Sequence, residues 1–348
     1  MKRVTMPFYN DQARDSLNAI NRISYTPPII AVVLPCYRTT RHVLDVIRSI
    51  GPEVSHIFAV DDKCPEHTGD LIKRECCDPR VRVLRHEANR GVGGAVKTGY
   101  QAALEAGCDI IVKVDSDGQM DPALIPLFVQ PILDGKADYT KGNRFFNIEK
   151  VKNMPTVRLV GNAGLSFINK FSTGYWRIFD PTNGYTAIHA TVAALLPFNK
   201  ISDRYFFESD MLFRLNTFQG VVVDIPMEAV YGDEQSNLRV RKIFFEFLWK
   251  HVRNFFKRIF YNYYLRDMSI ASLVLPLGIL MVIFGTYYGV SHWIYSVQNS
   301  IYASAGTVML AVLPIMLGIQ FLLSFLHADM AVDFREPLHI KIRSSYKL

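Results

Sequence analysis

The sequence predicts an α/β domain with a mainly parallel sheet, followed by a basic amphipathic helix and a two-helix transmembrane hairpin. Short β-branched runs alternate with helical stretches in the N-terminal part, which is the pattern of βαβ units. No Lys, Arg, Asp or Glu occurs from Met268 to Ala328. The net charge of +7 arises entirely after residue 238. Together these observations place a soluble domain before a membrane anchor.

The N-terminal elements alternate along the chain. The expected strands are 29–34, 57–60, 81–84 and 110–114, and the expected helices are 40–50, 68–76 and 91–106. In parallel sheets, ligands gather outside the carboxyl ends of the strands. Because Pro35, Asp61, Asp62, Asp115 and Asp117 all follow strands, we expect them to meet at one rim of the sheet.

The segment Asp115-Ser116-Asp117-Gly118-Gln119 carries the chemistry expected at this rim. Side chains alternate along a strand, so Asp115 and Asp117 point one way and Ser116 the other; Gln119 joins the acids if Gly118 turns the backbone. Two carboxylates and an amide oxygen form a partial cage for a hard divalent cation and leave positions open for phosphate oxygens. The alternative for an isolated Asp-x-Asp is a solvated turn.

A glycine-rich loop, 89–99, leads into the third expected helix. Its Gly-x-Gly-Gly spacing differs from the dinucleotide-binding fingerprint. The loop offers free amides at a helix N-terminus near Gly94, with Lys97 one turn further on, and both suit an anion. Close packing of the helix on the sheet explains the glycines equally well.

Two apolar runs, 269–290 and 303–326, are each long enough to cross a bilayer of roughly 30 Å as a helix. The aromatic and amide-rich stretch 291–300 between them is expected to form a turn at the headgroup level. Cations flank the pair but are missing between the runs, so the positive-inside rule places both ends of the hairpin in the cytoplasm. A pair of buried core helices is the alternative.

The stretch 239–267 reads as a basic amphipathic helix. Leu248, Val252 and Ile259 recur at helical spacing, whereas Lys250 and Arg258 fall on other faces. Such a helix suits the cytoplasmic headgroup plane and membrane lipids; an ordinary core helix is the alternative. Because the basic residues flank membrane helices and the soluble part is neutral, no nucleic-acid partner is expected.

The ordered motifs resemble a family-two glycosyltransferase of the polyprenyl-phosphate type, the group that contains dolichol-phosphate mannose synthases and bacterial undecaprenyl-phosphate glucosyltransferases. The resemblance runs from residue 29 to residue 238. The segments that carry it are 33–37, 60–62, 89–95, 115–122, 141–145, 180–185, 207–211 and 223–226. It implies a nucleotide-sugar-binding glycosyltransferase A-type domain.

For the donor, the resemblance implies that Asp61 or Asp62 contacts the base or ribose of a nucleotide sugar near Pro35 and Tyr37. It also implies that Asp115, Asp117 and Gln119 hold Mg²⁺ or Mn²⁺ on the donor diphosphate. The expected donor-binding set is completed by Ser116, Gly94 and Lys97. The family often has Asn-Glu after its first Pro-x-Tyr, whereas Arg38-Thr39 stand here, so a carboxylate contact from this loop is not expected.

For the acceptor, the resemblance implies that Arg144, with Arg158 as the best match for a second basic position, receives the lipid phosphate. A phosphate is already ionised at pH 7, so it needs cationic positioning and no general base. Lys170 and Arg177 are further candidate cations. Glu208 and Asp210 resemble the acidic pair where related inverting enzymes keep their base; with a phosphate acceptor they order Arg144 or the sugar hydroxyls instead.

These expectations divide the chain into five parts. They are a polar extension (1–27), a cytoplasmic catalytic domain (28–238), an interfacial helix region (239–267), two transmembrane helices with a short loop (268–328) and a basic cytoplasmic tail (329–348). The expected location is the plasma (inner) membrane. Whether the protein is a monomer or a homo-oligomer is left open.

The expected function is metal-dependent, inverting transfer of a single sugar from a UDP- or GDP-hexose to a polyprenyl phosphate. Asp117, Arg144, Glu208 and Asp210 are the expected catalytic residues. A processive polysaccharide synthase shares the fold, but its typical Gln-x-x-Arg-Trp motif and additional spans are missing from this sequence. A third alternative is a membrane-tethered nucleotide-sugar binder without catalysis.

Overall fold

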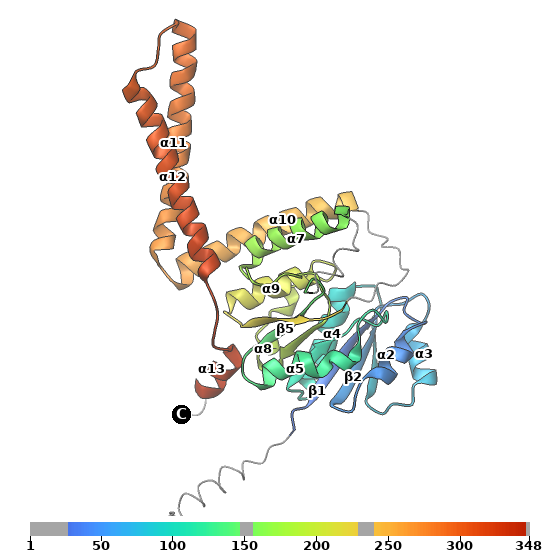
Figure 1. The fold of residues 1–348 in the computed structure, drawn as a ribbon. Helices are drawn as coiled ribbons and strands as arrows, with labels where there is room; N and C mark the ends of the chain where they lie inside the picture. The colour runs from blue at the N-terminus through green and yellow to red at the C-terminus, as the bar shows by residue number, and fades with distance from the viewer. Residues whose placement is uncertain (1–26, 147–155, 229–239, 346–348) are drawn as a thin grey trace, which may run out of the picture.

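A seven-stranded sheet forms the centre of the soluble part, in the order β3-β2-β1-β4-β6-β5-β7 (Figure 1). The computed structural model describes residues 27–146, 156–228 and 240–345. The strands are β1 (Ile30–Cys36), β2 (Val54–Asp61), β3 (Val81–Arg85), β4 (Ile110–Lys113), β5 (Tyr139–Asn143), β6 (Thr186–His189) and β7 (Val222–Pro226). All neighbouring pairs are parallel except those of β6, which is antiparallel to β4 and β5. The predicted mainly parallel sheet is confirmed.

Apolar side chains on both faces of the sheet produce two cores. Along β1, Val32 and Leu34 belong to one core, whereas Ala31 and Val33 belong to the other, because successive side chains of a strand alternate. Helices α2 (Val43–Ser49), α3 (Thr68–Glu75) and α5 (Ile125–Leu133) cover the first face; α4 (Val92–Glu105), α8 (Ala190–Ala194) and α9 (Phe207–Thr217) cover the second. A sheet buried on both faces explains why its strands read as continuous apolar runs.

Two longer helices, α7 (Thr156–Thr173) and α10 (Val240–Phe260), cover α9, and the second of them leads to the C-terminal helical hairpin. Helices α7 and α10 lie side by side (Figure 1). A π-helical turn, Tyr261–Arg266, then leads from α10 to α11 (Ile270–Asn299), which forms an antiparallel hairpin with α12 (Ala305–Ala331). Both hairpin helices are long and apolar enough to cross a membrane. The hairpin projects away from the soluble part on the α7 and α10 side.

The stretch 291–300 differs from its expected turn conformation. Helix α11 continues to Asn299 and ends at Ser300, which has the left-handed φ of 54°. No glycine or proline interrupts residues 291–299, so the helix continues through them. The connection is therefore confined to the few residues before Ala305.

The chain returns to the soluble part after α12. The short helix α13 (Leu338–Ser345) is attached to the carboxylate of Asp138, which lies just before β5. Asp138 accepts the N–H groups of Leu338 and His339 at 2.8 and 3.0 Å and contacts the His339 ring at 2.7 Å. Both ends of the hairpin are thus joined to the same domain.

Candidate active site

A pocket of about 740 Å³ lies at the carboxyl ends of β1, β2 and β4, where the alternating pattern places the candidate site. We call it the rim pocket. Of the predicted residues, it is lined by Pro35, Tyr37, Asp62, Asp115, Ser116 and Asp117. Strands far apart in the sequence thus bring these side chains together, because parallel neighbours end at the same edge.

The carboxylates of Asp61 and Asp62 are held by the protein itself. Asp61 accepts two backbone N–H groups in the loop and first turn that lead into α3, at 2.7 and 2.8 Å, and does not line the rim pocket. Asp62 contacts the His86 ring at 2.6 Å and accepts the N–H groups of Arg90 and Gly91 at 2.8 and 2.7 Å. Asp62 therefore fixes the start of the glycine-rich loop against β2.

Gly94 and Lys97 lie behind the rim pocket and do not line it. The N–H of Gly94 donates to the carbonyl of Asp203 at 2.9 Å. The ammonium of Lys97 pairs with the Asp203 carboxylate at 2.5 Å and donates to the carbonyls of Phe198 and Ile201. In the structure both residues hold α4 against segment 198–203, which lies outside the sheet.

The loop after β4 carries an oxygen-rich donor set. Asp115 and Asp117 line the rim pocket, and the Gln119 N–H donates to Asp117 Oδ1 at 3.0 Å, because Gly118 with φ 78° turns the backbone. Hard oxygen ligands of this kind fit Mg²⁺ or Mn²⁺. Within the described ranges, no three His, Cys, Asp or Glu side chains gather to hold a metal. A cation here would thus need oxygen atoms of a bound substrate to complete its coordination.

Ser116 has a structural contact in addition to its place in the pocket. Its hydroxyl donates to the carbonyl of Pro35 at 2.6 Å and lies 3.0 Å from the hydroxyl of Thr39. These contacts join the loop after β4 to the loop after β1. The pocket wall is therefore fixed on this side by direct hydrogen bonds.

Lys113, at the end of β4, is a buried cation directly beneath the acidic loop, and the sequence patterns did not identify it. Its ammonium contacts Asp115 Oδ1 at 2.8 Å, the carbonyl of Gly184 at 3.0 Å and Glu208 Oε1 at 3.6 Å. Burial alone would lower the pKa of Lys113, but Asp115 and Glu208 outweigh burial and raise it. Lys113 therefore stays protonated and holds one oxygen of Asp115.

Glu208 and Asp210 share the first turn of α9 but have different surroundings. Burial raises the pKa of Glu208, opposed by Lys113 and Lys141. The carboxylate of Asp210 accepts the N–H and hydroxyl of Ser202 at 3.0 and 2.6 Å and the amide of Asn254 at 2.8 Å. Through these contacts Asp210 links α10 to the segment before α9. Neither acid lines the rim pocket.

Arg144 follows β5 and is held by a buried carboxylate. Its Nε and Nη2 donate to Asp180 Oδ2 and Oδ1 at 2.7 and 3.0 Å, which is a bidentate pair. Arg158 lies in the first turns of α7, but its side chain is outside the described residues. Lys170 donates to the carbonyl of Trp176 and Arg177 pairs with an acid after α12.

Arg204 and Tyr205 also line the rim pocket, although the sequence patterns did not single them out. Tyr205 is 60% exposed. The signal available in the sequence is a cation and an aromatic residue just before the acidic turn of α9. A guanidinium suits a phosphate and an aromatic ring suits a base.

Arg258 of α10 lies on a different side of the helix from the one the sequence predicts. The sequence placed its guanidinium on a headgroup-facing side, but Arg258 is 2% exposed and pairs with Asp329 of α12. Phe245, Trp249 and Phe256 are instead exposed on α10. The predicted helix is present, but one of its cations faces the protein.

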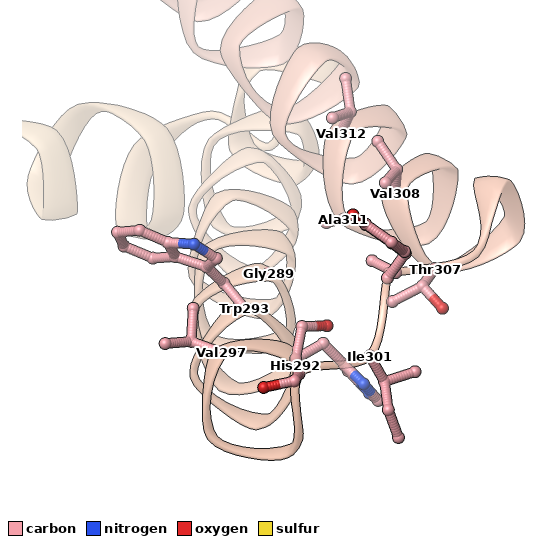
Figure 2. Close-up of a pocket in the computed structure, with 13 residues that line it drawn as sticks. Gly289, His292, Trp293, Val297, Ile301, Thr307, Val308, Ala311 and Val312 are labelled. Atoms are coloured by element: carbon pink, nitrogen blue, oxygen red, sulfur yellow. The ribbon is translucent and has the colours of Figure 1, made fainter.

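A second pocket, of about 590 Å³, lies at the end of the hairpin farthest from the soluble part (Figures 1 and 2). His292 and Trp293 of α11 and Val308 of α12 are among the residues that line it. None of its lining residues is Asp, Glu, Lys or Arg. It is separate from the acidic loop and does not share its chemistry.

Comparison with known proteins agrees with this geometry. Residues 31–195 match the glycosyl transferase family 2 profile. The chain is 30% identical to an undecaprenyl-phosphate mannosyltransferase of Micrococcus luteus, over 58% of this chain and 83% of the relative. It is 29% identical to a UDP-N-acetylglucosamine–dolichyl-phosphate N-acetylglucosaminyltransferase of Methanococcus voltae, over 59% of this chain and 87% of the relative.

Solved structures share the fold. Mannosyl-3-phosphoglycerate synthase from Rubrobacter xylanophilus has a TM-score of 0.52 and 16% identity, over 75% of this chain and 80% of that one. Glucosyl-3-phosphoglycerate synthase from Mycobacterium tuberculosis, with Mn²⁺, UDP-glucose and phosphoglyceric acid, has a TM-score of 0.50 and 17% identity, over 73% and 85%. The sheet, the rim pocket and the relatives agree: the chain belongs to glycosyltransferase family 2, as a glycosyltransferase of the polyprenyl-phosphate group.

Proposed function

We propose that this protein is a membrane glycosyltransferase that moves a single sugar from a nucleotide-diphosphate sugar, a UDP- or GDP-hexose, to a polyprenyl phosphate with inversion. The observation that carries the proposal is the acidic loop Asp115–Asp117 on the wall of a pocket large enough for a nucleotide sugar. The names of the relatives supply the acceptor class.

Asp115, Asp117 and Gln119 are the proposed ligands of Mg²⁺ or Mn²⁺. Such a cation neutralises the charge that builds on a departing nucleoside diphosphate. The structure of the same fold from M. tuberculosis contains Mn²⁺ with UDP-glucose, which supports this proposal. Lys113 holds Asp115 Oδ1, so in this assignment Asp115 presents its second oxygen to the pocket.

The donor nucleotide is proposed to bind between the loop after β1 and the segment before α9. Tyr37 and Tyr205 are exposed aromatic residues on the pocket wall, and Arg204 adds a cation near the expected diphosphate. Arg144, oriented by Asp180, is the proposed contact of the acceptor phosphate, with Arg158 as the second. An ionised phosphate attacks the anomeric carbon without a general base, so Glu208 and Asp210 are assigned to ordering the site.

The membrane arrangement follows from charge and apolar surface. The hairpin α11–α12 is proposed to span the membrane as a multi-pass anchor, with α10 at the cytoplasmic headgroup plane. Exposed Phe245, Trp249 and Phe256 suit acyl chains, and the exposed cations Arg253 and Lys257 suit anionic headgroups. The protein should stay in membranes through a pH 11 carbonate wash; release would contradict a spanning hairpin.

The function is tested by incubating membranes that carry the protein with a panel of UDP- and GDP-hexoses and undecaprenyl or dolichyl phosphate. The mass of the lipid product identifies the sugar and the acceptor. Chelation by EDTA and the variant Asp117→Asn should each abolish transfer, and Asp117→Asn should keep the wild-type thermal midpoint. Full activity in either case, or no lipid-linked sugar with any donor, would refute the proposal.

A further inference from the structure

Asp329 lies in the last turn of α12, where the hairpin meets the soluble part. It is 2% exposed, and both of its oxygens are occupied. Arg258 donates through Nη1 and Nη2 at 2.6 and 2.9 Å, the Tyr263 hydroxyl at 2.8 Å and the Trp176 ring N–H at 3.0 Å. Four donor groups from three residues therefore converge on one carboxylate: Arg258 and Tyr263 come from α10 and the turn that continues it, and Trp176 comes from the segment after α7.

A buried carboxylate with this set of donors is a rigid joint. Moving α12 away from the domain would break the hydrogen bonds of the Asp329 carboxylate and its ion pair with Arg258, and breaking a buried ion pair costs far more free energy than breaking an exposed one. Arg258 Nη2 also donates to the carbonyl of Phe171 near the end of α7, at 2.9 Å. The joint thus includes α7 as well as α10 and α12.

Trp176 connects this joint to the proposed acceptor site. Four residues later in the chain comes Asp180, which is 1% exposed and holds Arg144 through two hydrogen bonds. The intervening backbone is fixed at the carbonyl of Trp176 by Lys170, at 2.8 Å, and at the carbonyl of Phe179 by the Ser166 hydroxyl, at 2.7 Å. We call residues 176–180 the bridging segment.

We propose that Asp329 is a positioning residue that, through Trp176 and the bridging segment, holds Arg144 at a fixed height relative to the membrane. This inference rests on the proposed function, because it takes the acceptor to be an isoprenoid phosphate. The hydrocarbon tail of such an acceptor keeps its phosphate near the headgroup plane. The Arg144 guanidinium must therefore lie at the same distance from the membrane plane as the acceptor phosphate. The contacts of Asp329 connect Arg144 to the end of a transmembrane helix.

The decisive comparison is between Trp176→Phe and Tyr263→Phe. Each removes one hydrogen bond to the same Asp329 carboxylate and keeps an aromatic ring, but only Trp176 belongs to the bridging segment. KM for each substrate is measured with undecaprenyl phosphate in lipid vesicles and with citronellyl phosphate, a short acceptor free in solution. Asp329→Glu, which keeps the charge but shifts it by one methylene, is a second variant should Trp176→Phe fail to fold.

With undecaprenyl phosphate in vesicles, Trp176→Phe and Asp329→Glu should raise the acceptor KM by roughly threefold to tenfold, because a hydrogen bond to a charged group is lost or distorted. Their donor KM and their KM for citronellyl phosphate should stay at the wild-type values, and Tyr263→Phe should leave all three unchanged. The inference would be overturned if Trp176→Phe and Tyr263→Phe changed the acceptor KM equally. It would also be overturned if Trp176→Phe raised the KM for both acceptors equally, or if it changed no KM at all. If the wild-type protein transfers sugar to neither acceptor, the proposed function itself fails.

Discussion

Gly184 decides how closely Asp115 and Lys113 pack beneath the rim pocket. A Cβ at this position would fall on both the Asp115 carboxylate and the Lys113 ammonium, closer than real Cβ contacts allow. The carbonyl of Gly184 also accepts from Lys113. The backbone here therefore takes part in holding the acidic loop.

Gly184→Ala should lower kcat/KM by at least about tenfold, because overpacking forces Asp115 or Lys113 out of place. Affinity for Mn²⁺ with UDP, measured by calorimetry, should fall as well. Gly161→Ala on α7 is the control, since none of the described atoms lies within 4 Å of a Cβ there. Wild-type activity and Mn²⁺ affinity in Gly184→Ala would show that the position of Asp115 is unimportant.

Lys141 is a second buried ammonium near Glu208. Burial lowers its pKa to about 8, against the attraction of Glu208 and Asp180. It donates to the carbonyl of Asn183. Lys113 of β4 and Lys141 of β5 thus both partly neutralise the buried carboxylate of Glu208 on α9.

At the scale of elements, the segment before α9 is held in place by Asp210. It accepts from Ser202 on this segment and from Asn254 on α10. The same segment carries Arg204 and Tyr205 to the rim pocket. One buried carboxylate therefore holds both a pocket wall and helix α10.

Asp210→Ala should raise the donor KM severalfold, because the Ser202 contacts that fix the pocket wall are lost. It should also cost about 3 kcal/mol of stability, since three donors lose their acceptor. Asn254→Ala is the matched control: it removes only the α10 contact, so it should lower the thermal midpoint and leave the donor KM unchanged. A wild-type donor KM in Asp210→Ala would show that the segment before α9 does not contribute to donor binding.

Helix α10 also carries a histidine that makes the packing of α10 sensitive to acid. His251 is 2% exposed, and its Nδ1 lies 2.7 Å from the Ser172 hydroxyl of α7. Burial lowers the pKa of His251 to about 4, from 6.5. His189 has its pKa lowered to about 4 as well, by burial and by His339.

Between pH 6.5 and 4 these histidines are protonated in the unfolded chain but remain neutral in the folded protein. The free energy of unfolding should therefore fall as the pH drops through this window. His251 accounts for roughly 3 kcal/mol of that loss at the acid end. Thermal midpoints of His251→Gln, measured from pH 7 to 4 in detergent, should show a shallower decline than the wild type, with the His189 contribution remaining. Identical slopes would rule out His251 as a cause.

At the scale of the whole molecule, the hairpin is held together by small residues. A Cβ on Gly318 would lie 2.7 Å from a Val282 methyl group and 2.8 Å from the carbonyl of Gly278. Small residues let two helix backbones approach closely, and the resulting van der Waals contacts stabilise the association of apolar helices. The position of Asp329, which lies in α12, relative to α11 therefore depends on this crossing.

Gly318→Leu should push α12 away from α11 and lower the thermal midpoint in detergent by several degrees, because the overpacked crossing costs about 1 to 3 kcal/mol. Activity on an acceptor in vesicles should fall with it. Gly306→Ala, where the nearest described atom to a Cβ is 3.8 Å away, should change neither. An unaltered midpoint in Gly318→Leu would mean that the two helices do not pack at this point.

Local patterns predicted much of this architecture. The apolar runs that became β1, β2 and β4, the charge-free interval that became α11 and α12, and the acidic loop at Asp115 are readable because each depends on neighbours in the sequence. Side-chain alternation and strand ends even placed Pro35, Asp62 and Asp117 at one rim. The stretch 291–300 was misread because aromatic and amide residues suit a membrane interface in a helix as well as in a turn.

By itself, then, the sequence determined the α/β class, the apolar hairpin and the acidic loop. The tertiary structure decided the partners: Lys113 with Glu208, Asp210 with Asn254, and Arg258 with Asp329 come from elements far apart in the chain. Nothing local distinguishes a buried charge from a solvated one, because burial depends on what the rest of the chain packs over it. The physical reason is that secondary structure follows short-range patterns, whereas the pairing of charges follows the complete fold.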